Sequence, residues 1–135
     1  MNNKVWVNGT FDVLHLGHVK LLEFASSLGD LRVGIDSDKR VKELKGEDRP
    51  FNNTDDRKSM LSSLKYVNDV VVFDSREEML KLIKEWKPDY MVVGSDYECK
   101  EVIGGELANE LIFFDRIDEY STTKILNYYK EINNI

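Results

Sequence analysis

The alternation of short apolar runs with helical patterns restricts the fold of this chain more than any other feature. Five β-rich runs are expected, at residues 5–7, 31–36, 69–74, 89–94 and 111–115. Apolar residues at helical spacing and helix-start signals predict helices at 13–28, from Thr54 to Lys65, from Ser75 to Trp86 and from Ser121 onward. Strands that alternate with helices are typical of a parallel, doubly wound α/β sheet.

This pattern predicts one α/β domain over residues 1–135, with a five-stranded parallel sheet flanked by helices. The polar segment 37–53 contains Pro50 and is expected to be a partly ordered loop. In sheets of this kind the ligand crevice lies beyond the carboxyl ends of the strands. Residues that directly follow a predicted strand are therefore the first candidates for a site.

Charge and cysteine content exclude several classes of partner. A net charge of −6 argues against a nucleic-acid surface. The single cysteine, Cys99, cannot form an internal disulfide and fits a reducing cytoplasm. We find no apolar run long enough for a signal peptide or a membrane span, so the expected location is cytoplasmic, without membrane or nucleic-acid partners.

The segment NGTFDVLHLGHVK, residues 8–20, follows the first predicted strand and carries both histidines. Gly9 ends the strand, and His15 and His18 are three residues apart, so they share one face of the helix start. Cationic groups at the electropositive end of a helix are unfavourable unless an anion binds there. Together with the N–H groups of the first turn, they predict a phosphate site.

A second helix start carries the same signal near the other end of the chain. In RIDEYSTTKI, residues 116–125, Ser121 is the expected N-cap and Lys124 stands where a capping box has Glu or Gln. An anion held by Lys124, by the N–H groups of Thr122 and Thr123, and by Arg116 would account for this lysine. Taken alone, one lysine in a first turn is more often a solvated surface residue. Two histidines could also form half a metal site, but no spacing completes it, so no protein metal site is expected.

These two segments resemble the paired signatures of a known superfamily. GTFDVLHLGH is similar to the first signature of the HxGH nucleotidylyltransferases, which have a Rossmann-like domain, and R-x4-STTKI is similar to their second signature. Within the superfamily the chain resembles glycerol-3-phosphate cytidylyltransferases. It also resembles the adenylyltransferase domain that acts on heptose 1-phosphate.

The resemblance implies transfer of a nucleotidyl group from CTP or ATP to a phosphorylated small-molecule acceptor, with release of pyrophosphate and use of Mg²⁺. The catalytic residues it implies are His15, His18, Lys45, Arg116 and Lys124. The nucleotide-binding residues are Gly9, Thr10, Phe11, Gly17, His18, Gly94, Asp96, Arg116, Ser121, Thr122 and Thr123. The acceptor-binding residues are Asp12, Lys45, Arg57 and Lys65, and the expected assembly is a homodimer.

One segment departs from the superfamily. Relatives commonly carry RYVD near the middle of the chain, where this sequence has KYVN at 65–68. Lys65 lacks the planar fork of arginine and Asn68 lacks a carboxylate, so any pairing made by that segment in relatives, such as one at a dimer interface, is in doubt here.

Two nucleotides and two other function classes stay open at this point. LKGEDRPFN, GSDY and VIGGE resemble the heptose 1-phosphate adenylyltransferases, whereas the C-terminal signature and the chain length favour CTP, which is the first expectation. A nucleotide-binding module without catalysis would not need both histidines, Arg116 and Lys124. A flavodoxin-like carrier would need a flavin site that scattered aromatic residues do not provide.

Overall fold

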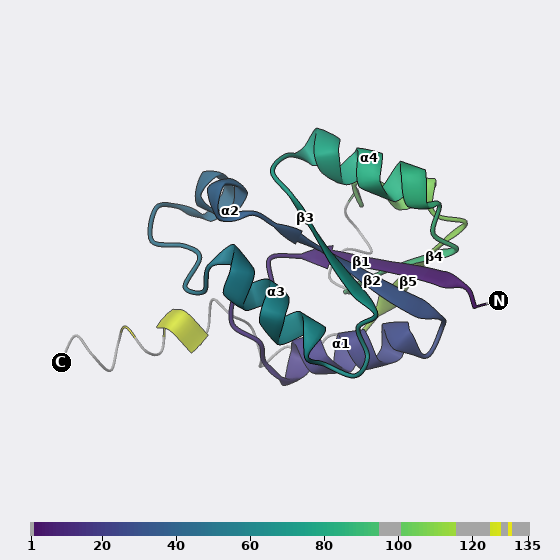
Figure 1. The fold of residues 1–135 in the computed structure, drawn as a ribbon, viewed down its shortest axis with the longest axis horizontal. Coiled ribbons are helices and arrows are strands. Elements are labelled where there is room, and N and C mark those ends of the chain that lie inside the picture. Colours follow the sequence, from purple (N-terminus) through teal and green to yellow (C-terminus); the bar gives the residue numbers. More distant parts are fainter. Residues whose placement is uncertain (1, 95–100, 116–124, 128–129, 131–135) are drawn as a thin grey trace.

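The computed structural model describes residues 2–94, 101–115, 125–127 and 130 of the chain (Figure 1). One sheet contains five strands: β1 (Lys4–Gly9), β2 (Asp30–Asp36), β3 (Asp69–Phe73), β4 (Tyr90–Gly94) and β5 (Glu110–Phe114). The helices are α1 (Leu16–Ser26), α2 (Asp38–Lys45), α3 (Thr54–Ser62), α4 (Arg76–Trp86) and the short 3₁₀ helix η2 (Gly105–Leu107). Residues 125–127 and Lys130 are also helical.

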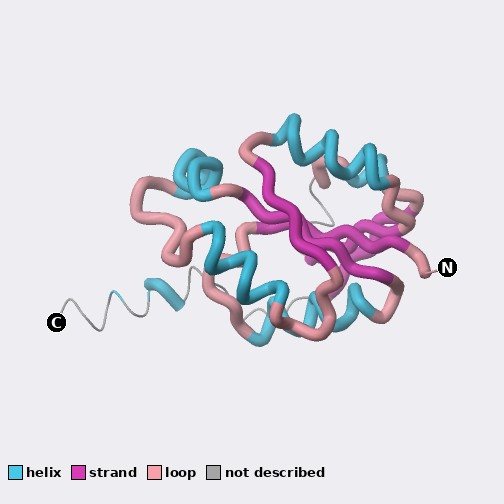
Figure 2. Tube along the Cα trace, in the orientation of Figure 1, coloured by secondary structure: helices cyan, strands magenta, loops and turns pink. Residues whose placement is uncertain are grey.

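All the strand pairs are parallel, and the strand order is β3-β2-β1-β4-β5. Figure 2 shows the strands as one twisted layer between helices. The predicted five-stranded parallel α/β sheet is therefore confirmed. The chain winds outward from β1 toward β3 and then returns to place β4 on the other side of β1. Crevices for ligands form where the winding direction changes, here between the carboxyl ends of β1 and β4.

Alternating side chains along the strands build a core on each face of the sheet. Val5 and Val7 of β1 pack with Leu22 of α1 and Leu61 of α3 on one face. Trp6 points to the other face, where it packs with residues of α4 such as Ile83. Figure 1 shows the same division, with α1 and α3 on one side of the sheet and α4 on the other.

The indole of Trp6, on β1, packs over the neighbouring strand β2 because β2 has a glycine, Gly34, at the point of contact. A Cβ at Gly34 would lie 2.5 Å from the Cζ2 atom of Trp6. The indole therefore occupies the volume that any larger side chain at this position would need. The contact packs β1 closely against β2, and both strands contribute residues to the cavity at their carboxyl ends.

The segment 37–53 differs from the sequence-based expectation of a partly ordered loop. Residues Asp38–Lys45 form α2, and the side chain of Ser37 caps it by accepting a hydrogen bond from the backbone N–H of Arg40 at 3.3 Å. Only Val41 of this helix is buried, and charged residues make up most of its sequence DKRVKELK, so it offers few of the apolar residues by which a helix is recognised in sequence. The cap and a run of good helix formers stabilise it instead.

Helix α3 begins at Thr54, where the sequence predicts it, but ends at Ser62 instead of Lys65, and its cap is the residue before Thr54. Asn53 caps the helix, accepting from the N–H of Asp56 at 2.8 Å, and Thr54 is the first helical residue. The Thr54 hydroxyl accepts instead from the N–H of Asp38 at 3.0 Å, which ties the start of α3 to the start of α2. Ser75 caps α4 as predicted.

Candidate functional site

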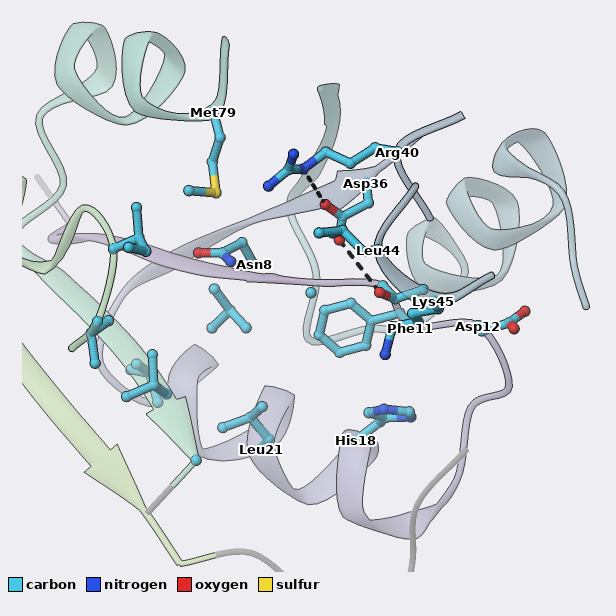
Figure 3. Close-up of a pocket in the computed structure, with 18 of the residues that line it drawn as sticks. Asn8, Phe11, Asp12, His18, Leu21, Asp36, Arg40, Leu44, Lys45 and Met79 are labelled. Atoms are coloured by element: carbon cyan, nitrogen blue, oxygen red, sulfur yellow. Dashed lines mark hydrogen bonds and ion pairs between the residues drawn. The ribbon is translucent and has the colours of Figure 1, made fainter. Parts of the chain in front are cut away.

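A cavity of about 570 Å³ lies at the carboxyl ends of β1, β2 and β4, between α1 and α2 (Figure 3). Its volume is in the range of pockets that hold small molecules. Nine of the residues predicted from the sequence line it: Gly9, Thr10, Phe11, Asp12, His15, Gly17, His18, Lys45 and Gly94. The fold therefore brings the histidine turn together with residues from α2 and from the end of β4.

The two histidines form a reciprocal cap at the start of α1. His15 is the N-cap, and its Nδ1 accepts from the backbone N–H of His18 at 3.4 Å. The Nδ1 of His18 accepts from the backbone N–H of His15 at 3.3 Å. The two rings stack with their centroids 3.7 Å apart. A ring nitrogen that accepts a hydrogen bond carries no proton, so in this arrangement each neutral ring carries its hydrogen on Nε2.

This geometry corrects the electrostatic premise drawn from the sequence. The histidines do not conflict with the positive end of the helix dipole, because they act there as hydrogen-bond acceptors. The cap is complete without an anion. What suits an anion is the character of the second ring nitrogen, because in this tautomer Nε2 carries a hydrogen and is a donor at a helix start.

Phe11 holds His18 from the side of the cavity. Its ring centroid lies 5.0 Å from that of His18, at an interplanar angle of 56°. Phe11 has φ of 49°, a left-handed conformation that is unfavourable for a residue with a side chain and that recurs at functional sites. Gly9 makes room for this turn, since a Cβ there would lie 3.0 Å from the Phe11 ring.

Asp12 fastens the loop after α2 to the histidine turn. Its carboxylate, 1% exposed as a residue, accepts from the N–H groups of Phe51 and Asn52, both at 2.8 Å, and from the Nε of Arg49 at 3.1 Å. The amide of Asn52 donates to the backbone carbonyl of Asp12. The role expected for Asp12 was acceptor binding. In the structure, the Asp12 carboxylate is instead bonded to the loop that follows α2.

We expect Asp12→Asn to loosen this loop without unfolding the sheet. The amide cannot accept from three donors as the carboxylate does, so opening of residues 46–53 becomes easier by roughly 1–3 kcal/mol. Limited trypsin digestion should then cut after Lys45 about tenfold faster or more than in the wild type. Glu47→Gln, an exposed change in the same loop, is the control. Equal rates in both variants would contradict the role assigned to Asp12.

Asp36, at the end of β2, links the turn after β1 to α2 across the cavity. Its carboxylate accepts from the Thr10 hydroxyl at 3.4 Å and from the Nε of Arg40 at 3.0 Å. Sequence reasoning missed both Asp36 and Arg40 as lining residues. The signal available was their i, i+4 spacing across the start of α2, which is too common among surface pairs to indicate a site.

Arg57 is fully buried, and each of its donor groups has an acceptor. Its Nε donates to the carbonyl of Asn52, Nη1 to the carbonyls of Thr10 and Asp36, and Nη2 to Asp38 and Thr54. Acceptor binding was expected for Arg57. This correction has a physical reason: a guanidinium with 0% exposure and a filled set of acceptors holds the loops of the site together and does not face the cavity.

The pKa of Asp38, which pairs with Arg57, is lowered by the same contacts. Burial acts to raise the pKa of Asp38, but hydrogen bonds involving Thr54 and Arg57 outweigh it and hold that pKa below its ordinary value. The carboxylate form of Asp38 is therefore favoured in the folded protein.

Lys65 lies outside the site. It follows α3, which carries the chain from the carboxyl ends of the strands to their amino ends, and its Nζ is 5.3 Å from the ring centroid of Tyr66. Asn68 of the same KYVN segment accepts from the N–H of Leu31 at 3.0 Å, at the start of β2. The acceptor role expected for Lys65 is thus not supported by its position.

The remaining expectations fall outside the described residues. They concern Asp96, Arg116, Ser121, Thr122, Thr123 and Lys124. Where the structure describes the chain, no group of three His, Cys, Asp or Glu side chains is arranged to bind a metal ion. No helix in that part of the chain is both long enough and apolar enough to cross a bilayer.

Comparison with known proteins finds a matching family profile and curated relatives that are about half identical to this chain. The profile of the family described as cytidylyltransferase-like matches residues 6–127. The bifunctional protein HldE of Campylobacter fetus is 49% identical over 127 residues, which are 93% of this chain and 28% of that protein. The HldE of a Nitratiruptor species is 50% identical over 123 residues, or 90% of this chain and 26% of that protein. The chain thus spans about a quarter of the length of these curated relatives.

A solved structure is similar over nearly its whole length. The lipopolysaccharide core biosynthesis protein from Thermoplasma volcanium superposes with a TM-score of 0.69 at 25% identity, over 88% of this chain and 98% of that one. The profile match covers far more than half of the residues and includes the histidine turn that lines the cavity. The chain belongs to the cytidylyltransferase-like family.

Proposed function

We propose that this protein is a nucleotidyltransferase that joins the nucleotidyl group of ATP to the phosphate of a sugar 1-phosphate and releases pyrophosphate. The observation that carries the proposal is the paired histidine cap, which places two stacked imidazoles at a helix start that lines the cavity. Membership of the cytidylyltransferase-like family supports the reaction class.

The reaction needs positioning and charge stabilisation more than covalent chemistry. An oxygen of the acceptor phosphate attacks the α-phosphorus of the nucleotide, and the bond to the bridging oxygen breaks, so pyrophosphate leaves with the electron pair. His15 and His18 would donate to oxygens of the triphosphate, and the charge that grows there in the transition state would strengthen these hydrogen bonds. Lys45, exposed at the end of α2, would neutralise phosphate charge from the opposite wall.

Magnesium is proposed as part of the nucleotide substrate. Asp12 and Asp36, the carboxylates that line the cavity near the histidines, already accept from Arg49 and Arg40. They do not fit a resident metal site, so the ion would arrive on the phosphates of the nucleotide. No step of the mechanism above depends on a protein-bound ion.

ATP is preferred here over the CTP that the chain length and C-terminal signature favoured. Identity of about one residue in two with the HldE proteins supports the adenylyltransferase branch, which LKGEDRPFN and VIGGE also resemble. Apolar residues at the β4 side of the cavity offer a surface for a base but do not distinguish a purine from a pyrimidine: Val92, Val93, Val102 and Ile103. Discrimination would come from hydrogen bonds to the base edge.

Thermal unfolding with each nucleotide tests this choice. ATP with Mg²⁺ at about 100 times its Kd should stabilise the protein by about 2.7 kcal/mol, whereas CTP at the same concentration should give a much smaller shift. A shift with CTP and none with ATP would restore the cytidylyltransferase interpretation.

A pyrophosphate-release assay separates an enzyme from a module that only binds nucleotide. We expect release with ATP and a hexose 1-phosphate, and little with glycerol 3-phosphate. Nucleotide binding without release from any pair of substrates would favour the non-catalytic module. A homodimer and a cytoplasmic location remain predictions, and light scattering on the purified protein would test the first.

A further inference from the structure

Arg40 and Arg49 both line the cavity, and each gives its Nε to a carboxylate, Arg40 to Asp36 and Arg49 to Asp12. The side chain of Arg40 is 19% exposed and its Nε is engaged by Asp36, which is itself 11% exposed. Among the residues that the structure describes, none is paired with its two Nη groups. Figure 3 shows the guanidinium directed away from Asp36 and into the cavity, toward Met79.

The position of Arg40 separates it from the reacting phosphates. In Figure 3, Arg40, Asn8 and Met79 lie on one side of β1, and His18 and Leu21 lie on the other. A nucleotide held by its phosphates at the histidines would leave the end near Arg40 for the part of the acceptor that does not react. In this arrangement the non-reacting portion of the acceptor lies near Arg40, and the phosphate of the acceptor lies near the histidines.

The charge at this end of the cavity favours hydroxyl groups over a second anion. Asp36 balances the charge of Arg40, and the neighbouring groups are the amide of Asn8 and the thioether of Met79. The side-chain oxygen of Asn8 accepts from the Trp6 indole at 3.0 Å, so its amide nitrogen is turned away from that contact as a further donor. Several donors in a locally neutral wall match the oxygen atoms of a polyhydroxylated group.

We infer that Arg40, oriented by Asp36, is a specificity-determining residue that donates from its Nη groups to hydroxyl oxygens of the sugar portion of the acceptor. The inference rests on the proposed function for the identity of the acceptor phosphate. It adds the residue that distinguishes a sugar phosphate from a small phosphate. Because Asp36 also holds Thr10, the same carboxylate fixes both the turn after β1 and the recognition group.

Binding measurements with two phosphates test the inference in the absence of nucleotide. Mannose 1-phosphate carries a sugar ring, and methyl phosphate does not. In NMR-monitored titrations of the full chain, Arg40→Met should weaken mannose 1-phosphate binding roughly 10- to 100-fold. The preference for mannose 1-phosphate over methyl phosphate should fall by a similar factor.

Two further variants separate recognition from folding. Arg40→Lys keeps a cation for Asp36 but loses the fork, so an intermediate loss is expected together with wild-type thermal stability. Lys39→Met, an exposed neighbour on α2, should leave both affinities unchanged. Equal weakening of both phosphates, unchanged mannose 1-phosphate binding in Arg40→Met, or no preference for it in the wild type would overturn the inference. Selective binding that depends on Arg40 but no pyrophosphate release with ATP would instead contradict the proposed function.

Discussion

Replacing His18 by alanine is expected to lower turnover at least 100-fold while the sheet remains folded. The alanine removes an Nε2–H donor that the helix start holds in place before the substrate binds, and loss of one such donor typically slows a reaction 10²- to 10³-fold. It also removes the acceptor for the backbone N–H of His15, which should lower the free energy of unfolding by about 1 kcal/mol. Pyrophosphate release and urea unfolding measure the two effects.

His18→Asn separates the chemistry from the cap. The side-chain oxygen of asparagine can take the place of Nδ1 and accept from His15, but no group of asparagine reaches the place of Nε2. We therefore expect stability close to that of the wild type with the same loss of turnover as in His18→Ala. Lys20→Gln is the control on the same helix, because Lys20 is exposed and forms a surface ion pair with Glu23. Turnover near the wild-type value in His18→Asn would remove His18 from the mechanism.

Replacing Arg57 by methionine should produce the largest loss of stability, about 2–4 kcal/mol, because a buried guanidinium with several hydrogen bonds is removed. The change leaves three backbone carbonyl groups, the Asp38 carboxylate and the Thr54 hydroxyl without this donor, and the carbonyl of Asp36 is in a buried contact. Lys58→Met is the control, since Lys58 is the exposed neighbour on α3 and its loss should change stability by less than about 0.5 kcal/mol. Urea unfolding followed by circular dichroism gives both values.

The loss of stability in Arg57→Lys is expected to lie between those of Arg57→Met and Lys58→Met, because an ammonium keeps the charge but cannot reach all of the acceptors. The effect should also depend on pH. The pKa of Asp38 is lower in the folded protein, so its stabilisation is fully present above the unfolded value and is lost as the pH falls through the folded value. Arg57→Met should reduce this acid sensitivity. If Arg57→Met unfolded at the same urea concentration as Lys58→Met, the structural role of Arg57 would be wrong.

The sequence by itself determined the strands, most of the helices and the location of the site. Apolar runs of strand length and caps such as Ser75 are local signals. A parallel sheet then places the residues that directly follow each strand at the same edge. This is why nine predicted residues line one cavity although they come from β1, α1, α2 and β4. The helix α2 is absent from the sequence-based prediction because it is short and mostly charged and buries a single residue, Val41, so its composition is that of a polar loop.

What each site residue does was decided by contacts between distant parts of the chain. Asp12 and Asn52 are 40 residues apart, and Arg57 and Thr10 are 47 apart, so no local pattern could show that Asp12 holds a loop or that Arg57 is buried. The same holds for the orientation of Arg40 toward the cavity. Even for His15 and His18, only three residues apart, spacing cannot show which ring nitrogen accepts a hydrogen bond. That depends on the backbone N–H groups that the folded turn directs at each ring, and these groups make Nδ1 the acceptor on both rings.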